Sequence, residues 1–334
     1  ILLSNKLDSI YKDFYKNYPK FKIIESANES TRIEDVQAQL NEETQLIAYF
    51  LGEQSLFSFN ITKDTVSLLR ADISDKLIKS TNDFKNHLSK REDINELSYD
   101  LYMYLLGQQL NREKKNLIIV ADNVLNYIPF EILRSSNGSL LIENYNVSYN
   151  GSVRIYLELK KDFFNYETPN NWVGFAPKYF NDATLSSSIE EVNEIAKLTD
   201  GVKFIEGAAN KQNFRLHNKE FSIIHLAMHA KIDNENPLYN RLLFDDEELT
   251  ASEIYTSTSK ANLAVLSACN TGFGKIEKGE GVMSMARAFH YSGIPSVLMS
   301  LWKVPDQETK IIMTDFYRYL KKGKSKSESL RMAK

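Results

Sequence analysis

Cysteine is nearly absent from this sequence, which has one in 334 residues. A single cysteine excludes an internal disulfide and any zinc site built from several cysteines, and it is typical of a reducing compartment. The chain also lacks an apolar run of the roughly 20 residues that span a membrane, and no signal-peptide pattern opens it. We therefore expect a cytoplasmic protein that contacts no membrane and needs no metal or other cofactor.

The sequence also has little excess charge of either sign, because it contains 41 lysines and arginines and 44 aspartates and glutamates, and its net charge is −3. Such a balance provides no general attraction to nucleic acid. The local basic runs 112–115 and 321–326 are typical of solvated surface. The Gly- and Lys-rich stretch 270–281 lacks the Walker spacing of Gly, four residues and Gly-Lys-Ser/Thr. The sequence thus predicts no direct binding of nucleic acid or nucleotide.

In other respects the composition is that of an ordinary globular protein, with 43% hydrophobic and 25% charged residues. The length suits one enlarged α/β domain with an appendage better than one average domain. The chain starts at Ile1 rather than Met and stops within the helical pattern of 331–334. We therefore expect a piece of a longer protein.

Two short apolar runs each end in a reactive side chain. Ile223–Met228 precedes His229, and Leu263–Ala268 precedes Cys269, the single cysteine. Both runs have the length and composition of buried strands in a parallel sheet. In open α/β sheets the chemistry lies outside the carboxyl ends of the strands, so neighbouring strands would bring His229 and Cys269 to one crevice.

A His–Cys pair at this place suits nucleophilic catalysis. A thiol near pH 7 is mostly protonated, and an imidazole can favour the thiolate and later protonate a leaving amine. Taken singly, a lone cysteine is usually a small buried hydrophobe, and a histidine at a strand end is usually structural. The order favours catalysis, because the histidine comes about 40 residues before the cysteine and the spacing in caspases is about 50.

The sequence from about Leu117 to its end resembles the CHAT domain, a family of bacterial caspase-like and separase-like cysteine peptidases that often accompany TPR repeats. The resemblance covers roughly two thirds of the chain and rests on motifs in the family's order, which are 117–133, 225–229, 236–238, 242–244, 249–254, 266–272, 279–281 and 293–306. It implies that His229 is the catalytic histidine, Cys269 is the nucleophile, and His225 is structural. It also implies that the backbone N–H groups of Ala230 and Cys269 form the oxyanion hole. The family usually has Gly where this chain has Ala230, and Ala takes positive φ less readily.

The resemblance implies a caspase-like, three-layer α/β fold with a mostly parallel central sheet flanked by helices, extended at its N-terminus by helices and a β-meander. We expect a helical linker over 1–40 that ends an upstream TPR region, an N-terminal part over 41–165, and a catalytic part over 166–334. Apolar patterning predicts a helix over 1–21, strands within 45–69, two helices within 73–112 broken near 91–93, and a first strand of the main sheet at 116–121.

The function that these residues indicate is that of a cysteine endopeptidase acting on a protein substrate. By resemblance, Ser267 lines the first specificity pocket, and a carboxylate there would favour a basic or long side chain before the cleaved bond. The candidate carboxylates are Asp233, Glu277, Glu280 and Asp306.

Two other functions remain open: a catalytically inactive scaffold with the same fold, and an acyl transferase that uses the same dyad. The glycines of 270–281 predict an active-site loop that can reorder, and hence an enzyme gated by a partner. The family's known associations imply a regulatory protein or an upstream TPR region as that partner, or an RNA-guided effector complex of a prokaryotic defence system.

Overall fold

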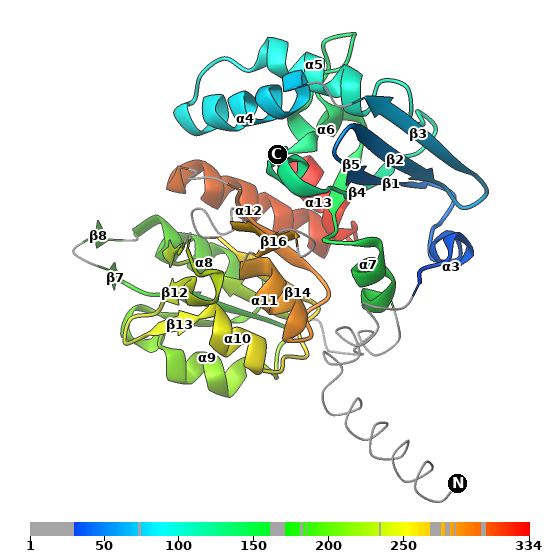
Figure 1. Ribbon diagram of the computed structural model, residues 1–334. Coiled ribbons are helices and arrows are strands. Elements are labelled where there is room, and N and C mark those ends of the chain that lie inside the picture. Colours follow the sequence, from blue (N-terminus) through cyan, green and yellow to red (C-terminus); the bar gives the residue numbers. More distant parts are fainter. Residues whose placement is uncertain are drawn as a thin grey trace, which may run out of the picture. The chain divides into compact units, whose positions relative to one another are not determined.

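The computed structural model describes residues 30–72, 75–160, 171–180, 183–184, 186–233, 235–267, 275–277, 281–283, 285–301 and 305–334 (Figure 1). The chain divides into two compact units. Unit 1 contains Glu158–Thr271 and Ser284–Met299, and unit 2 contains Thr31–Leu157, Gly272–Met283 and Ser300–Lys334. No helix among these residues is long and apolar enough to cross a membrane.

Unit 1 is built on a parallel sheet of five strands in the order β17-β14-β10-β6-β9. The strands are β6 (Trp172–Ala176), β9 (Val202–Ile205), β10 (Ile223–Leu226), β14 (Leu263–Leu266) and β17 (Val297–Met299). Every neighbouring pair runs parallel. The three central strands are almost wholly buried, as their continuous apolar sequences predict for a sheet covered on both faces.

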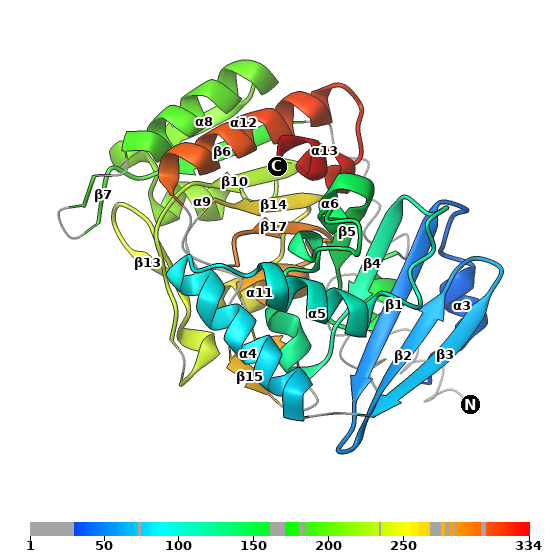
Figure 2. The same cartoon turned by 90° about the horizontal axis from the view of Figure 1, so that it is seen from above.

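Helices cover both faces of this sheet, and alternate residues of each strand face opposite layers. The helices are α8 (Ser186–Thr199), α9 (Lys211–His217), α10 (Ala251–Thr256) and α11 (Met285–Tyr291). Phe175 and Ile224 pack in one cluster with Phe214 of α9 and Phe289 of α11. On the other face His225 meets α8. Figure 2 shows the strands side by side, with α8 and α11 on opposite sides of them.

A small antiparallel sheet follows β10 in unit 1. Its strands are β11 (Ala230–Lys231), β12 (Arg241–Leu243) and β13 (Glu248–Thr250). Thr250 then caps α10, because its hydroxyl accepts from the N–H of Glu253 while the Glu253 carboxylate accepts from the N–H of Thr250. The remaining short elements are β7 (Tyr179–Phe180), β8 (Ala183–Thr184), η4 (Glu206–Ala208) and η5 (Pro237–Tyr239).

Unit 2 has its own sheet of five strands in the order β3-β2-β1-β4-β5. The strands are β1 (Thr44–Leu51), β2 (Ser55–Ile61), β3 (Val66–Asp72), β4 (Asn116–Val120) and β5 (Asn146–Tyr149). The first three form the antiparallel meander, whereas β4 and β5 continue the sheet in parallel. The helical elements are α3 (Ile33–Gln37), α4 (Asp75–Lys90), α5 (Asn95–Leu105), η1 (Asn123–Tyr127), η2 (Phe130–Ile132), α6 (Leu141–Asn144) and α7 (Val153–Leu159), the last of which crosses the division between the units.

The C-terminal part of unit 2 consists of α12 (Asp306–Lys321) and α13 (Lys326–Ala333), which pack against each other. Helix α13 also contacts β5, and the Arg331 guanidinium donates to the Asn146 amide oxygen over 2.8 Å. Strands β15 (Lys275–Glu277) and β16 (Gly281–Met283) form an antiparallel pair.

The expected fold class is confirmed, including the meander and the flanked parallel sheet. The break between two helices near 91–93 is also confirmed, since α4 ends at Lys90 and α5 begins at Asn95. One expectation was wrong: the strand at 116–120 pairs with β1 and β5 in unit 2 instead of starting the sheet of unit 1. The helix expected over 1–21 lies outside the described residues.

Candidate active site

The two strands that precede His229 and Cys269 are neighbours. Strands β10 and β14 run parallel, and Leu226 lies opposite Leu266 at their carboxyl ends. His229 and Cys269 follow these paired residues at the same interval along the chain. The condition that the two strands are neighbours is therefore met, whereas Cys269 itself lies outside the described residues.

The backbone of His229 is held between two sheets. On its N-terminal side the N–H of Ala227 donates to the carbonyl of Phe175 in β6 over 2.9 Å. The carbonyl of His229 accepts from the N–H of Leu243 in β12 over 3.0 Å. Met228, between these two anchors, is only 2% exposed. The position of His229 thus follows from backbone hydrogen bonds on both sides of it.

The pairing of β11 with β12 determines where the Ala230 N–H points. Ala230 lies opposite Leu242, and the hydrogen bond between the flanking residues His229 and Leu243 makes this a pair that exchanges no hydrogen bonds itself. The N–H of Ala230 is therefore directed away from β12. Among the described non-glycine residues, those with positive φ are Arg91, Asn123, Asp200 and Glu206, so Ala230 adopts its conformation without the strain that a replaced glycine could bring.

The imidazole of His229 is partly buried, and no residue in the described part of the chain hydrogen-bonds it. The nearby His225 is different. Its Nε2 atom lies 2.7 Å from Oε1 of Glu191 on α8, and the two side chains are 0% and 3% exposed. His225 is thus a buried residue inside β10, which agrees with its expected structural role.

Asp233 occupies the loop that follows β11, and its carboxylate organises this loop. Its Oδ1 atom accepts from the N–H groups of Glu235 and Asn236 over 2.9 and 2.8 Å. These two bonds, led by the one from Asn236, lower the pKa of Asp233. The N–H of Asp233 in turn donates to the Oδ1 atom of Asn240 over 2.7 Å. The residue is therefore engaged in a turn next to β11.

The other proposed pocket residues are described to different extents. Ser267 directly follows β14, and its hydroxyl oxygen is buried without a hydrogen-bond partner among the residues described. Glu277 ends β15 and Asp306 begins α12, but only their backbone is described. Glu280 lies outside the described residues. Of the five residues, Asp233 comes shortly after β11, the strand that directly follows His229. Ser267 comes directly after β14, the strand that precedes Cys269.

Sequence reasoning missed the ionic cluster on the three-stranded sheet beside His229. Glu248 of β13 contacts Arg241 of β12 at 2.8 Å and Lys231 of β11 at 3.3 Å. These bonds lower the pKa of Glu248, with the hydrogen bond from Arg241 the largest cause. The charges were visible in the sequence, but only the pairing of the strands shows that they meet. No group of three or more His, Cys, Asp or Glu in the described ranges could hold a metal ion.

The profile of the CHAT domain matches residues 91–334, which is well over half of the chain. The chain belongs to the CHAT domain family. A comparison with curated protein sequences found no match. Among solved structures, the chain is similar to one described as the Saccharomyces cerevisiae separase–securin complex, with a TM-score of 0.59 and 10% sequence identity. The similarity covers 86% of this chain and 28% of that one.

The CHAT match includes every residue of the candidate site, from His225 to Asp306. At 10% identity the likeness to the separase chain shows the fold alone, and it places this CHAT domain among caspase-like folds. The chain spans about 28% of the length of that separase chain. Fold and family together therefore identify the setting of the candidate site as that of a caspase-like peptidase family.

Proposed function

We propose that this protein is a caspase-like cysteine endopeptidase that hydrolyses peptide bonds of a protein substrate with His229 and Cys269. The observation that carries the proposal is the register of β10 and β14, because Leu226 lies opposite Leu266 and each candidate residue follows its strand at the same interval. Parallel neighbours end at the same edge of a sheet, where α/β enzymes place their chemistry.

In the proposed mechanism the Cys269 thiolate attacks the carbonyl carbon of the scissile peptide bond. His229 favours the thiolate and then protonates the leaving amine, which departs as a thioester forms on the sulfur. Water, deprotonated by His229, next attacks the thioester carbonyl and releases the acid and the thiol. Negative charge develops on the carbonyl oxygen in both steps, and we propose the N–H of Ala230 as one donor to this oxyanion. Its direction away from β12 supports this role, because the N–H is not used in pairing with that strand. The N–H of Cys269 is the second proposed donor.

Substrate choice is the finer part of the proposal. Ser267, whose buried hydroxyl has no hydrogen-bond partner among the described residues, would line the first pocket, together with a carboxylate that favours a basic or long side chain before the cleaved bond. Asp233 already accepts two backbone N–H groups in its turn, so the proposal assigns the pocket carboxylate to Glu277, Glu280 or Asp306 before Asp233.

We further propose that residues 166–334 form the catalytic part, with 41–165 as its N-terminal part. The active protein would be cytoplasmic and gated by a regulatory protein, by an upstream TPR region that ends in the helical linker 1–40, or by an RNA-guided effector complex of a prokaryotic defence system. The separase similarity is to a structure described as a complex with securin, which supports the idea of a protein partner.

The test is cleavage of a pooled peptide library, read by mass spectrometry. Wild type is compared with Cys269→Ala and His229→Ala. His87→Ala serves as a matched control, because it removes a histidine from α4, which is distant in sequence from the candidate site. We expect cleavage by wild type and the control and none by the two site variants. Cleaved bonds give the residue preference directly.

A second arm labels the protein with iodoacetamide, with and without candidate partner proteins. Labelling of Cys269 that depends on His229 supports the dyad even where the peptides are not cleaved. Cleavage that appears only with a partner supports gating. If Cys269 is unreactive and no peptide is cleaved in either condition, the proposal of an enzyme is overturned and the inactive scaffold remains. Transfer of an acyl group to an added amine would instead indicate an acyl transferase.

A further inference from the structure

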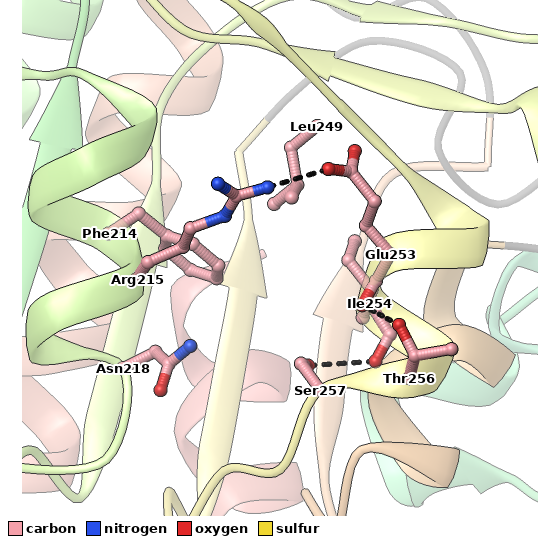
Figure 3. Close-up of a pocket in the computed structure, with 8 residues that line it drawn as sticks. All are labelled: Phe214, Arg215, Asn218, Leu249, Glu253, Ile254, Thr256 and Ser257. Carbon is pink, nitrogen blue, oxygen red and sulfur yellow. Dashed lines mark hydrogen bonds and ion pairs between the residues drawn. The ribbon is translucent and has the colours of Figure 1, made fainter.

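The cavity between α9 and α10 in unit 1 is rimmed by polar side chains that bond within the protein (Figure 3). Arg215 contacts Glu253 at 2.8 Å. The hydroxyls of Thr256 and Ser257 donate to backbone carbonyls of α10. Hydrogen-bonding groups that lack a partner among the described residues lie instead on the backbone of β3, the outermost strand of the sheet in unit 2 (Figure 2).

Alternate residues of β3 direct their backbone N–H and C=O groups away from the sheet. The N–H of Thr62 donates to the carbonyl of Thr65 over 2.9 Å, so the pair that flanks the turn between β2 and β3 is hydrogen-bonded. Along an antiparallel ladder such pairs alternate with pairs that exchange no hydrogen bonds. By the register, Val66, Leu68 and Arg70 belong to the second kind, so their backbone groups face the open edge of the sheet.

The side chains of β3 continue an exposed apolar face up to this edge. Val66 and Leu68 are 46% and 53% exposed. They share a face of the sheet with Phe59, which lies opposite Leu68, and with Phe50 of β1. These two phenylalanines are 37% and 57% exposed. Helices α3 and α7 cover the neighbouring part of the same face, so the uncovered part is a candidate surface for association.

Strand β3 lacks the features that usually protect an edge strand from pairing. Its seven residues Val66–Asp72 include no proline or lysine, and its register with β2 is unbroken by a bulge. The guanidinium of Arg70 is turned back toward the sheet, where its Nε atom donates to the Ser55 hydroxyl over 2.9 Å. The carbonyl of Asp72 accepts from the Tyr104 hydroxyl. The backbone open to another strand therefore stops short of Asp72.

Leu68 is the middle one of the three open residues, which makes the edge complementary to itself. An antiparallel strand with Leu68 opposite Leu68 places Val66 opposite the partner's Arg70, and every such pair exchanges hydrogen bonds. All the open N–H and C=O groups of the three residues then have partners in both copies. We propose that β3 pairs in this way with β3 of a second copy of the chain, across a two-fold axis. This pairing does not depend on the proposed peptidase activity.

The side chains favour a second copy over an unrelated strand. Paired residues of an antiparallel ladder point to the same side of the sheet, so the apolar faces of the two copies join at Leu68, beside Phe59 of each copy. An unrelated strand could satisfy the backbone without bringing apolar side chains to this place. Two-fold pairing also uses both open edges at once, so the assembly stops at a dimer. A contact of one short strand per copy is smaller than the roughly 1,600 Å² of stable complexes, so the dimer is weak.

The first measurement is sedimentation equilibrium of the whole chain from about 1 μM to about 1 mM, which covers weak association. We expect the average mass to rise with concentration toward twice the mass of one chain and no further. A mass that stays at one chain over the whole range, or that passes two chains, would overturn the proposal.

Charge at position 68 tests the two-fold register. Leu68→Lys and Leu68→Glu each place like charges opposite one another in the dimer, and we expect each variant alone to associate about tenfold more weakly. In an equal mixture association should recover, because a lysine then faces a glutamate. Ile311→Lys is the matched control, since it changes an apolar residue of α12 that is 59% exposed, and it should associate as wild type does. Unchanged association of Leu68→Lys, or no recovery in the mixture, would contradict the register.

A disulfide reports the same pairing directly. In a Cys269→Ala background, which removes the single native thiol, Leu68→Cys places two thiols at the axis with Cα atoms about 5.5 Å apart, within the range of a disulfide. Ser67→Cys is the control on the same strand, because its counterpart lies diagonally across the pair, about 7–8 Å away. After oxidation we expect a covalent dimer of the first variant on non-reducing electrophoresis. Equal cross-linking of Ser67→Cys would overturn the proposed register.

Discussion

The Nε2 atom of His225 in β10 lies 2.7 Å from Oε1 of Glu191 in α8, and both side chains are almost wholly buried. The ring of Trp172 lies beside the imidazole, with 5.8 Å between the ring centroids. The pair therefore ties the strand that leads to His229 to the helix layer on one face of the sheet. Burying two such groups is costly unless they satisfy each other.

The first prediction concerns this pair. Glu191→Ala leaves His225 without its carboxylate in a buried site, and we expect a loss of about 3–5 kcal/mol in the free energy of unfolding. His225→Ala should lose a similar amount. Urea denaturation followed by circular dichroism measures both. Lys197→Ala, at an exposed position of the same helix, is the control and should change stability by less than about 0.5 kcal/mol. A change in Glu191→Ala as small as that of the control would contradict the pair's contribution.

The second prediction concerns the N–H of Ala230. Ala230→Pro removes this donor, and if the N–H stabilises the oxyanion we expect kcat to fall about 100- to 1,000-fold. Ala230→Gly keeps the donor and should stay close to wild type. The measurement is peptide cleavage by variants whose unfolding midpoints are first shown to be similar. Normal turnover by a folded Ala230→Pro would exclude this N–H from the oxyanion hole.

The third prediction concerns acid stability. Burial alone would raise the pKa of Glu253, but hydrogen bonds from Lys211 and Thr250 lower it to about 2. Since this folded-state pKa lies below the unfolded value, the contribution to stability is complete above about pH 4.5 and is lost as the pH falls toward 2. Glu253→Gln should flatten the pH dependence of unfolding in that window, and the exposed Glu235→Gln should not. An unchanged slope in Glu253→Gln would contradict the assignment.

The fourth prediction separates two roles of Asp233. As a turn residue it accepts two backbone N–H groups, which an asparagine can also do. Asp233→Asn should therefore keep both the stability and the residue preference of cleavage, whereas Asp233→Ala should lower the unfolding midpoint. Cleavage of the peptide library and thermal unfolding test this. A switch of preference in Asp233→Asn would instead make Asp233 the carboxylate of the specificity pocket.

Local patterns in the sequence predicted most of the elements. Apolar periodicity placed α4 and α5 and the break between them, because a helix of this kind needs one apolar stripe and a polar interruption ends it. Thr250 and Glu253 form a capping box at the start of α10, and their spacing of three residues is a pattern that is visible in the sequence. By contrast, the four residues of the short helix α6 before β5 are too few to give a periodic signal in the sequence.

The choice of strand partners was not predictable in the same way. The run at 116–120 is as apolar as the strands of unit 1, yet it pairs with β1 of the meander. A buried strand has the same kind of apolar sequence in either sheet, because its composition depends on burial and not on which strand it pairs with. For the same reason the sequence did not predict the ion pairs of Glu248 with Arg241 and Lys231, which depend on the register of three strands.

The candidate site shows both sides of this division. His229 and Cys269 could be singled out from the sequence, because a reactive side chain after a short apolar run is a local feature. That Leu226 lies opposite Leu266 and that the Ala230 N–H points away from β12 both depend on contacts between segments far apart in the chain. Such contacts are set by packing and hydrogen bonding across the whole unit, so they emerge only once the chain has folded.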